Sequence, residues 1–224
     1  MTTIRTKSQT DEAACERRGR GRPRARSDEQ TRAIIYEAAR REFAAHGFAS
    51  TSMERVARDA GISTKTLYRL VPNKAALFEA MITERIDRLV SGVQLRACEG
   101  RNIAAGLRDA LMVCGELILD ANVIAMQQMI LSDNDKFPEI AETFFRRAIT
   151  PTQDTLASWL RTQHRRGLLV VDDADAAAGM LLGMLAFQPQ RAVMYGHAPA
   201  PTREQLEQRV AACTKLFLEG CGKR

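Results

Sequence analysis

Two helices that are too short to be stable alone occupy residues 51–71. They read TSMERVARDA and STKTLYRLV, and only Gly61 and Ile62 separate them. Because a helix of about two turns is unstable alone in water, other segments must hold both helices in place. Ile62, Leu67 and Leu70 are the apolar residues that can anchor the second helix. This constraint predicts a compact helix-turn-helix unit within a larger helical domain.

Polar residues and a glycine mark the ends of these helices. Thr51 and Glu54 have the spacing of a capping box, in which each side chain bonds a free backbone N–H at the helix start. Gly61 can take the left-handed conformation that ends a helix, and Ser63 is a typical N-cap for the next one. The pattern therefore predicts a tight turn between the two helices.

The rest of the chain also has the apolar spacing of helices. The segment SDEQTRAIIYEAARREFAAHG places Ile35, Ala39 and Phe43 at steps of four before a glycine. A longer helix is expected from about Lys74 into the nineties. Further helices are predicted at roughly 102–119, 122–132, 138–149, 151–166, 172–195 and 203–219. The only β-branched run, GLLVVDD, has no partner strand, so the predicted fold class is all-α.

Positive charge is concentrated in the first part of the chain. Residues 1–90 hold 18 Lys and Arg against 12 Asp and Glu, whereas residues 91–224 hold 15 of each. The net charge of +6 therefore comes entirely from the first part. Such segregation predicts a polyanionic partner for that part and a different role for the remainder.

Composition and motifs argue against several classes of protein. The five cysteines are odd in number and form no C-x-x-C pair, so we expect neither a disulfide framework nor a metal site. The longest uncharged run, residues 176–190, is shorter than the roughly 20 residues of a membrane span. Nothing resembles a nucleophile elbow, a P-loop or a zinc-protease motif. We expect a cytoplasmic protein that is not an enzyme and uses no cofactor.

The second short helix has a polar surface that suits nucleic acid. In a helix-turn-helix, the N-terminal residues of the second helix enter the major groove. Lys65 can donate to guanine, and the methyl groups of Thr64 and Thr66 can contact thymine methyls. Ser63 and Arg69 complete this surface. Side chains that flank the helix are assigned to phosphates: Thr51, Ser52, Tyr68 and Lys74. A solvated helical hairpin is the alternative that this pattern leaves open on its own.

The segment from about residue 28 to residue 88 resembles the N-terminal DNA-binding domain of the TetR/AcrR family of bacterial transcriptional regulators. The residues that carry this resemblance are Ala39, Phe43, Gly47, Thr51, Val56, Ala57, Ala60, Gly61, Ser63, Thr66, Leu67, Tyr68, Pro72, Lys74 and Leu77. The resemblance implies a homodimer that places two recognition helices in successive major grooves of double-stranded DNA. It also implies a ligand that moves these helices apart. Lys65 stands where the family often has glycine, so no operator sequence can be inferred.

The basic arm before this domain has a motif of its own. RGRP at residues 20–23 resembles the core of an AT-hook, which lies in the narrow minor groove of A·T-rich DNA. Arg20 and Arg22 would be attracted by the negative potential of that groove. A solvated basic tail is the alternative.

We therefore divide the chain into three parts. These are a disordered basic arm at 1–26, a helix-turn-helix DNA-binding domain at 27–90, and a ligand-sensing and dimerisation domain at 91–224. The segment DNDKFPEIAETFF in the last part resembles the AefR-like branch of the family. The family resemblance implies a homodimer formed through residues about 172–219, and an ordinary internal core helix is the alternative there.

The last part is expected to hold an adaptable apolar pocket, because methionine conforms to irregular ligands. The candidates are Met112, Met126, Met129, Phe144, Phe145, Trp159, Met180 and Met184, and core packing is the alternative for each. The family resemblance implies a repressor that binds a palindromic operator and is released by a ligand, and the apolar candidates predict a small apolar or amphipathic ligand. An architectural protein that binds A·T-rich DNA without an operator or ligand is the alternative.

Overall fold

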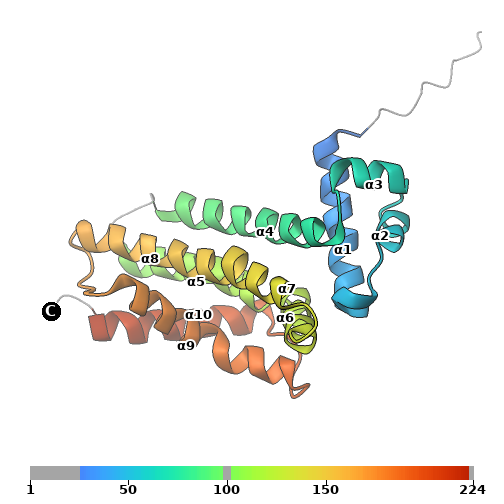
Figure 1. Ribbon diagram of the computed structural model, residues 1–224. Helices are drawn as coiled ribbons and strands as arrows, with labels where there is room; N and C mark the ends of the chain where they lie inside the picture. The colour runs from blue at the N-terminus through green and yellow to red at the C-terminus, as the bar shows by residue number, and fades with distance from the viewer. Residues whose placement is uncertain (1–25, 98–101, 222–224) are drawn as a thin grey trace, which may run out of the picture.

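The computed structural model describes residues 26–97 and 102–221, and the regular elements in these ranges are helices. The first four are α1 (Asp28–Ser50), α2 (Met53–Asp59), α3 (Thr64–Leu70) and α4 (Lys74–Ala97). Helices α1 to α3 form a group at one end of the molecule, and α4 runs from that group along the remaining helices (Figure 1). The predicted all-α fold is confirmed.

The later helices agree with the predicted segments within a few residues, with one difference. They are α5 (Ile103–Ile118), α6 (Ala121–Asp133), α7 (Pro138–Phe144), η1 (Phe145–Ile149), α8 (Thr150–Arg165), α9 (Ala174–Met194) and α10 (Arg203–Cys221). The segments predicted at 138–149 and 151–166 form one continuous helical run. A π-helical turn, η1, joins them: the N–H of Thr150 bonds to the carbonyl of Phe145 immediately before Pro151, which has no N–H to donate.

The turn between α2 and α3 is a Schellman motif. The N–H of Ile62 donates to the carbonyl of Ala57, and the N–H of Gly61 donates to the carbonyl of Arg58. Gly61 has φ 65°, the left-handed conformation predicted for the residue that ends α2. This turn sets the direction in which α3 leaves α2.

The start of α2 differs from the predicted capping box. Ser52, not Thr51, is the N-cap, and its Oγ accepts the N–H of Arg55 at 3.2 Å. Thr51 is only 3% exposed, and its hydroxyl donates to the carbonyls of Gly47 at 2.8 Å and Glu42 at 3.1 Å. The Thr51 side chain therefore binds the end of α1 and is not available for a phosphate.

Buried apolar side chains form two cores that do not follow the order of the chain. The first core joins α1, α2, α3 and the start of α4 with Met126, Met129 and Phe144 from α6 and α7. The second core joins the end of α4 with α5, α8, α9 and α10. Helices α6 and α7 therefore pack with the first three helices, although they lie far from them in sequence. The functional division at residue 90 stays a prediction.

Replacing Gly61 with Ala tests the importance of the turn. A Cβ atom there would have no heavy atom within 4 Å, so only the positive φ opposes it. We expect the free energy of unfolding, measured by urea denaturation, to fall by about 1–2 kcal/mol. Gly220→Ala in α10 is the matched control, because its Cβ also meets nothing within 4 Å and alanine favours a helix. Equal losses in the two variants would contradict this reading of the turn.

Candidate functional site

Helix α3 buries one face and presents the other to solvent. Leu67 and Leu70 are buried in the first core, which confirms the predicted anchor. Thr64, Lys65 and Tyr68 are exposed, and within the described ranges no hydrogen bond or ion pair involves their side chains. Three of the residues predicted to face DNA are therefore open to an external partner.

Ser63 holds the start of α3. Its Oγ accepts the N–H of Thr66 at 3.1 Å, and the two hydroxyls share a further hydrogen bond of 2.8 Å. The side chains of Ser63 and Thr66 thus stabilise the helix end that carries Thr64 and Lys65. They lie on the predicted surface, and both hydroxyls keep acceptor capacity for a second partner.

Arg69 ties the end of α3 to the start of α1. Its guanidinium donates two hydrogen bonds of 2.7 and 2.8 Å to the carboxylate of Asp28, and they lower the pKa of that carboxyl. Arg32 adds a bond of 2.9 Å to the carbonyl of Leu70. These contacts place Ser27, the residue that follows the basic arm, next to α3. The arm residues Arg20 and Arg22 lie outside the described residues.

Lys74 has a structural role in place of the predicted phosphate contact. Its ammonium group donates to the carbonyls of Phe48, Ala49 and Thr51 at 2.6, 3.1 and 3.0 Å, and it lies 4.6 Å from the centre of the Phe48 ring. Burial lowers the pKa of Lys74, and the carboxylate of Asp133 partly offsets that effect. All three donors are used within the protein, so Lys74 joins α4 to the end of α1 and to Thr51 before α2.

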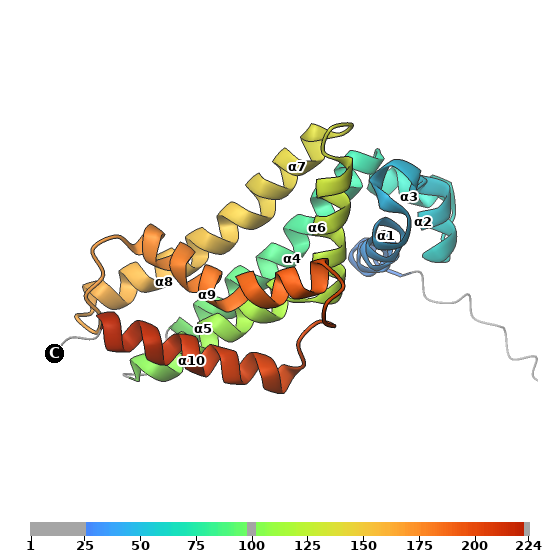
Figure 2. The same ribbon diagram turned by 90° about the horizontal axis from the view of Figure 1, so that it is seen from below.

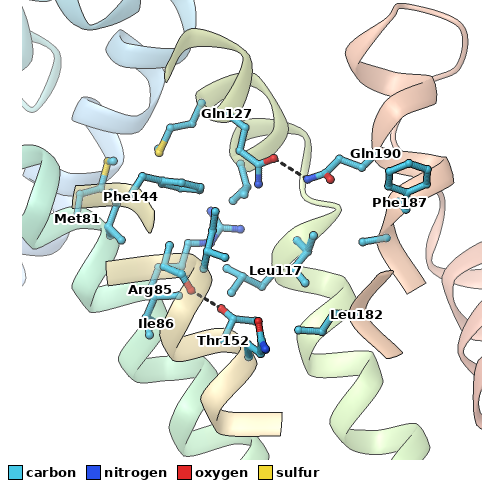
Figure 3. Close-up of a pocket in the computed structure, with 18 of the residues that line it drawn as sticks. Met81, Arg85, Ile86, Leu117, Gln127, Phe144, Thr152, Leu182, Phe187 and Gln190 are labelled. Atoms are coloured by element: carbon cyan, nitrogen blue, oxygen red, sulfur yellow. Dashed lines mark hydrogen bonds between the residues drawn. The ribbon is translucent and has the colours of Figure 1, made fainter. Parts of the chain in front are cut away.

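A cavity of about 300 Å³ lies between the two cores, at the small end of the range typical of ligand pockets. Its walls come from α4, α5, α6, η1, α8 and α9, with one residue each from α1 and α7, Arg40 and Phe144. Figure 3 shows Met81 and Phe144 on one side of the cavity and Leu182 and Phe187 on the other. The cavity thus touches the helices of both cores.

Of the eight predicted pocket residues, Met126 and Phe144 line this cavity. Met129 is buried in the first core, Trp159 is buried in the second, and Met112 packs against the second. The remaining three are exposed to solvent at 56, 68 and 37%: Phe145, Met180 and Met184. The apolar character of a residue does not show whether it lines the cavity, packs in a core or is exposed, because helices of this chain carry apolar side chains in all three places.

Polar lining residues were missed by the sequence analysis. Gln190 donates to the Oε1 of Gln127 at 2.6 Å and so joins α9 to α6 across one end of the cavity (Figure 3). Arg40 and Arg85 are the charged residues in the described lining, and no acidic residue accompanies them there. The available signal was weak: Gln127 directly follows the apolar run VIAM in α6, and Arg85 directly precedes Ile86 in α4.

Helices α9 and α10 form one outer surface of the molecule, at the lower side of Figure 1 and facing the viewer in Figure 2. Large apolar side chains of these two helices are exposed: Met180, Met184 and Phe187 from α9 and Leu216 from α10. The small residue Gly183 lies among them, and a Cβ there would meet nothing within 4 Å. Such a surface has the composition of an interface between subunits.

The described residues contain no group of His, Cys, Asp and Glu side chains that could hold a metal ion. Among them no helix is long and apolar enough to cross a membrane. Burial raises the pKa of the Cys114 thiol to about 12. A thiol held in its protonated form is a poor nucleophile, so Cys114 is a core residue in this fold.

The fold and α3 define a helix-turn-helix regulator of transcription, which is a DNA-binding protein and not an enzyme. Residues 35–81 match the bacterial regulatory proteins of the tetR family, and residues 105–221 match the C-terminal domain of AefR-like transcriptional repressors. The chain belongs to the TetR family, with an AefR-like C-terminal domain. Both resemblances found in the sequence are confirmed.

Three individual proteins that resemble this chain are 24 to 37% identical to it over the matched residues. The HTH-type transcriptional repressor SCO4008 of Streptomyces coelicolor is 37% identical over 69 residues, which are 31% of this chain and 36% of that protein. The chain thus spans about a third of the length of this curated relative. A TetR-family regulator from Mesorhizobium loti has a TM-score of 0.75 and 24% identity, over 89% of this chain and 100% of its own. The flavonoid-responsive regulator FrrA has a TM-score of 0.64 and 26% identity, over 88% and 99%.

Lys65 and Lys74 should respond differently to the same substitution. Lys74→Met leaves three carbonyls without their donor, so we expect the free energy of unfolding to fall by about 1–3 kcal/mol. Lys65→Met should leave stability unchanged and reduce affinity for the preferred DNA sequence by about 1–3 kcal/mol, with weaker discrimination between sequences. Denaturation and DNA binding are measured on both variants. A stability loss in Lys65→Met would contradict its assignment to the open surface.

Proposed function

We propose that this protein represses transcription as a homodimer that binds a palindromic operator through α3 and is released by a small apolar or amphipathic ligand. The observation that carries the proposal is the position of the cavity. It lies between the core that supports α3 and the core that includes α9 and α10. A ligand that alters the spacing of the cores would alter the position of α3. A DNA partner of this kind also implies a cytoplasmic location.

Helix α6 offers a direct route from the cavity to the DNA-binding helices. Met126 lines the cavity and also belongs to the first core, and Met129, one turn later, lies in the same core. The Met129 Cγ lies 3.8 Å from the point that a Cβ atom would occupy at Gly47. Gly47 has φ 76° and is the residue at which α1 changes direction. The ring of Phe137, just beyond α6, is 5.3 Å from that of Phe48. Displacement of α6 would therefore be passed to the end of α1.

Such a movement acts as a switch only if the ligand has different affinities for the two arrangements of the protein. A ligand shifts the equilibrium between two arrangements only if it binds one of them more tightly. The similarity to a flavonoid-responsive regulator supports a response to a small molecule, without indicating which one. We assign the cavity, and not the exposed methionines, to that ligand.

The exposed surface of α9 and α10 supports the homodimer. Two copies related by a twofold axis would each contribute the same apolar residues. This arrangement would bury Met180, Met184 and Leu216 and would present the two α3 helices as a pair. A pair of recognition helices requires two half-sites about one helical turn apart on the DNA.

Footprinting tests the regulator against the architectural alternative. We expect protection of a palindrome with two half-sites, whereas diffuse protection over A·T-rich tracts would favour the alternative. Met180→Glu should abolish the paired protection, because like charges would meet across a twofold axis. Leu131→Glu is the control, since Leu131 on α6 is 70% exposed and Met180 is 68% exposed. If both variants protect DNA like the unmodified protein, the assigned dimer surface is wrong.

Deletion of residues 1–26 tests the basic arm. The arm holds six arginines between positions 17 and 26, so its removal should weaken binding and make the plot of log K against log salt concentration shallower. Deletion of residues 1–16 is the control, because that segment holds 2 Lys and Arg against 3 Asp and Glu. The control deletion should leave the salt dependence unchanged. A slope that neither deletion changes would exclude the arm from the DNA contact.

A further inference from the structure

The charged side chains of the described cavity lining are all positive. Arg40 from α1 and Arg85 from α4 are the charged members, and the rest of the described lining is apolar or carries amide and hydroxyl groups. The acids that neutralise these arginines, Glu37, Glu84 and Asp120, lie outside the lining. Figure 3 shows Arg85 near the apolar side chains of Ile86 and Leu117.

Most polar groups of the lining already have partners within the protein. The Thr152 hydroxyl donates to the carbonyl of Ala148 at 2.7 Å, and the Gln153 amide donates to the carbonyl of Asp175 at 3.2 Å. Arg40 donates to the carboxylate of Glu37 through both Nε and Nη2. The Thr152 hydroxyl and the Gln153 amide therefore have little capacity left for a ligand, and Arg40 has fewer free N–H donors than Arg85.

Arg85 is different. Its guanidinium has a single ion-pair contact, 3.2 Å from Nη2 to Oδ2 of Asp120, and no hydrogen bond to any described residue. An arginine has five N–H donors in a planar fork that matches a carboxylate or a similar anion. Arg85 therefore has the largest unused donor capacity in the cavity wall.

We propose that the ligand of this cavity is an amphipathic anion, whose charged head group binds Arg85 and whose apolar body contacts α5, α6 and α9. This inference rests on the proposed function, in which the cavity is the ligand site. A neutral apolar ligand would give the remaining Arg85 donors no partner in a largely apolar site, and a cation would find no acidic side chain in the described lining.

An anionic ligand at Arg85 would compete with the carboxylate of Asp120 for the same guanidinium. Asp120 is the N-cap of α6: its Oδ1 accepts the N–H groups of Asn122 at 3.0 Å and Val123 at 3.1 Å, while Oδ2 faces Arg85. An incoming anion competes with Oδ2 and leaves the cap in place. Anion binding at Arg85 would thus weaken a link between α4 and α6, the helix that contacts α1.

Two fluorescent probes with the same aromatic skeleton test the head group. Anilinonaphthalene sulfonate carries an anionic group, and N-phenylnaphthylamine lacks it. We expect the anionic probe to bind about tenfold to a hundredfold more tightly, as charge-assisted hydrogen bonds allow. Arg85→Met should remove this preference. Arg88→Met should retain it, because Arg88 lies one turn further along α4, outside the lining, with a side chain that is 68% exposed.

Asp120→Asn gives a test in which the expected result is tighter binding, and misfolding would not produce that result. Asparagine remains a good N-cap, so α6 should keep its start, while Arg85 loses the acid that competes with the ligand. We expect the anionic probe to bind more tightly, by about threefold to tenfold, and the neutral probe to bind as before. Unchanged or weaker binding of the anionic probe would overturn the proposal.

The outcomes separate this inference from the proposed function. Equal affinity for the two probes, or a preference that survives in Arg85→Met, overturns the anionic head group and leaves the cavity as a ligand site. Gly179→Leu tests the cavity itself, since a Cβ there meets only Gln153, at an ordinary 3.6 Å, and a larger side chain would fill the space. If this variant binds both probes normally, they bind elsewhere, and both the inference and the ligand step of the proposed function fail.

Discussion

The three hydrogen bonds of the Lys74 ammonium group are the contact on which the arrangement of the DNA-binding helices depends. They join the first residue of α4 to two carbonyls at the end of α1, those of Phe48 and Ala49, and to the carbonyl of Thr51 before α2. The ring of Phe48 lies beside the same ammonium group and also contacts Phe43, Phe78 and Phe137. One junction therefore connects α1, α2, α4 and the segment before α7. Under the proposed function, movement of α4 would be passed to the DNA-binding helices through this junction.

The division of the apolar side chains into two cores gives the cavity its position. Helix α4 contributes its first half to one core and its second half to the other, and α6 supplies Met126 and Met129 to the first core from a distant part of the chain. The cavity occupies the boundary between the cores, and its lining includes both Arg40 of α1 and residues of α9. A binding site between two rigid bodies can act on their relative position, whereas a site within one core would mainly stabilise that core.

Local patterns predicted the features that depend on neighbours in sequence. Gly61 ends α2 in the expected conformation, Leu67 and Leu70 anchor α3, and Ser63 caps it. The Thr51 prediction was wrong, because Thr51 and Ser52 are equally good caps by type and the carbonyls of Glu42 and Gly47 decide between them. Six of the eight predicted pocket residues lie in cores or on the surface, since residue type does not reveal which apolar face of a helix meets a cavity.

The sequence by itself determined the helical class, the turn before α3, the segregation of positive charge and the family of the protein, because these follow from short-range spacing and composition. Only the tertiary structure decided which charged groups remain available. Lys74 and Arg69 are as cationic in sequence as Lys65, yet the first is bound by carbonyls and the second by Asp28, while Lys65 is open to solvent. The reason is physical: the partners of a side chain are set by packing between distant segments, and no local pattern encodes them.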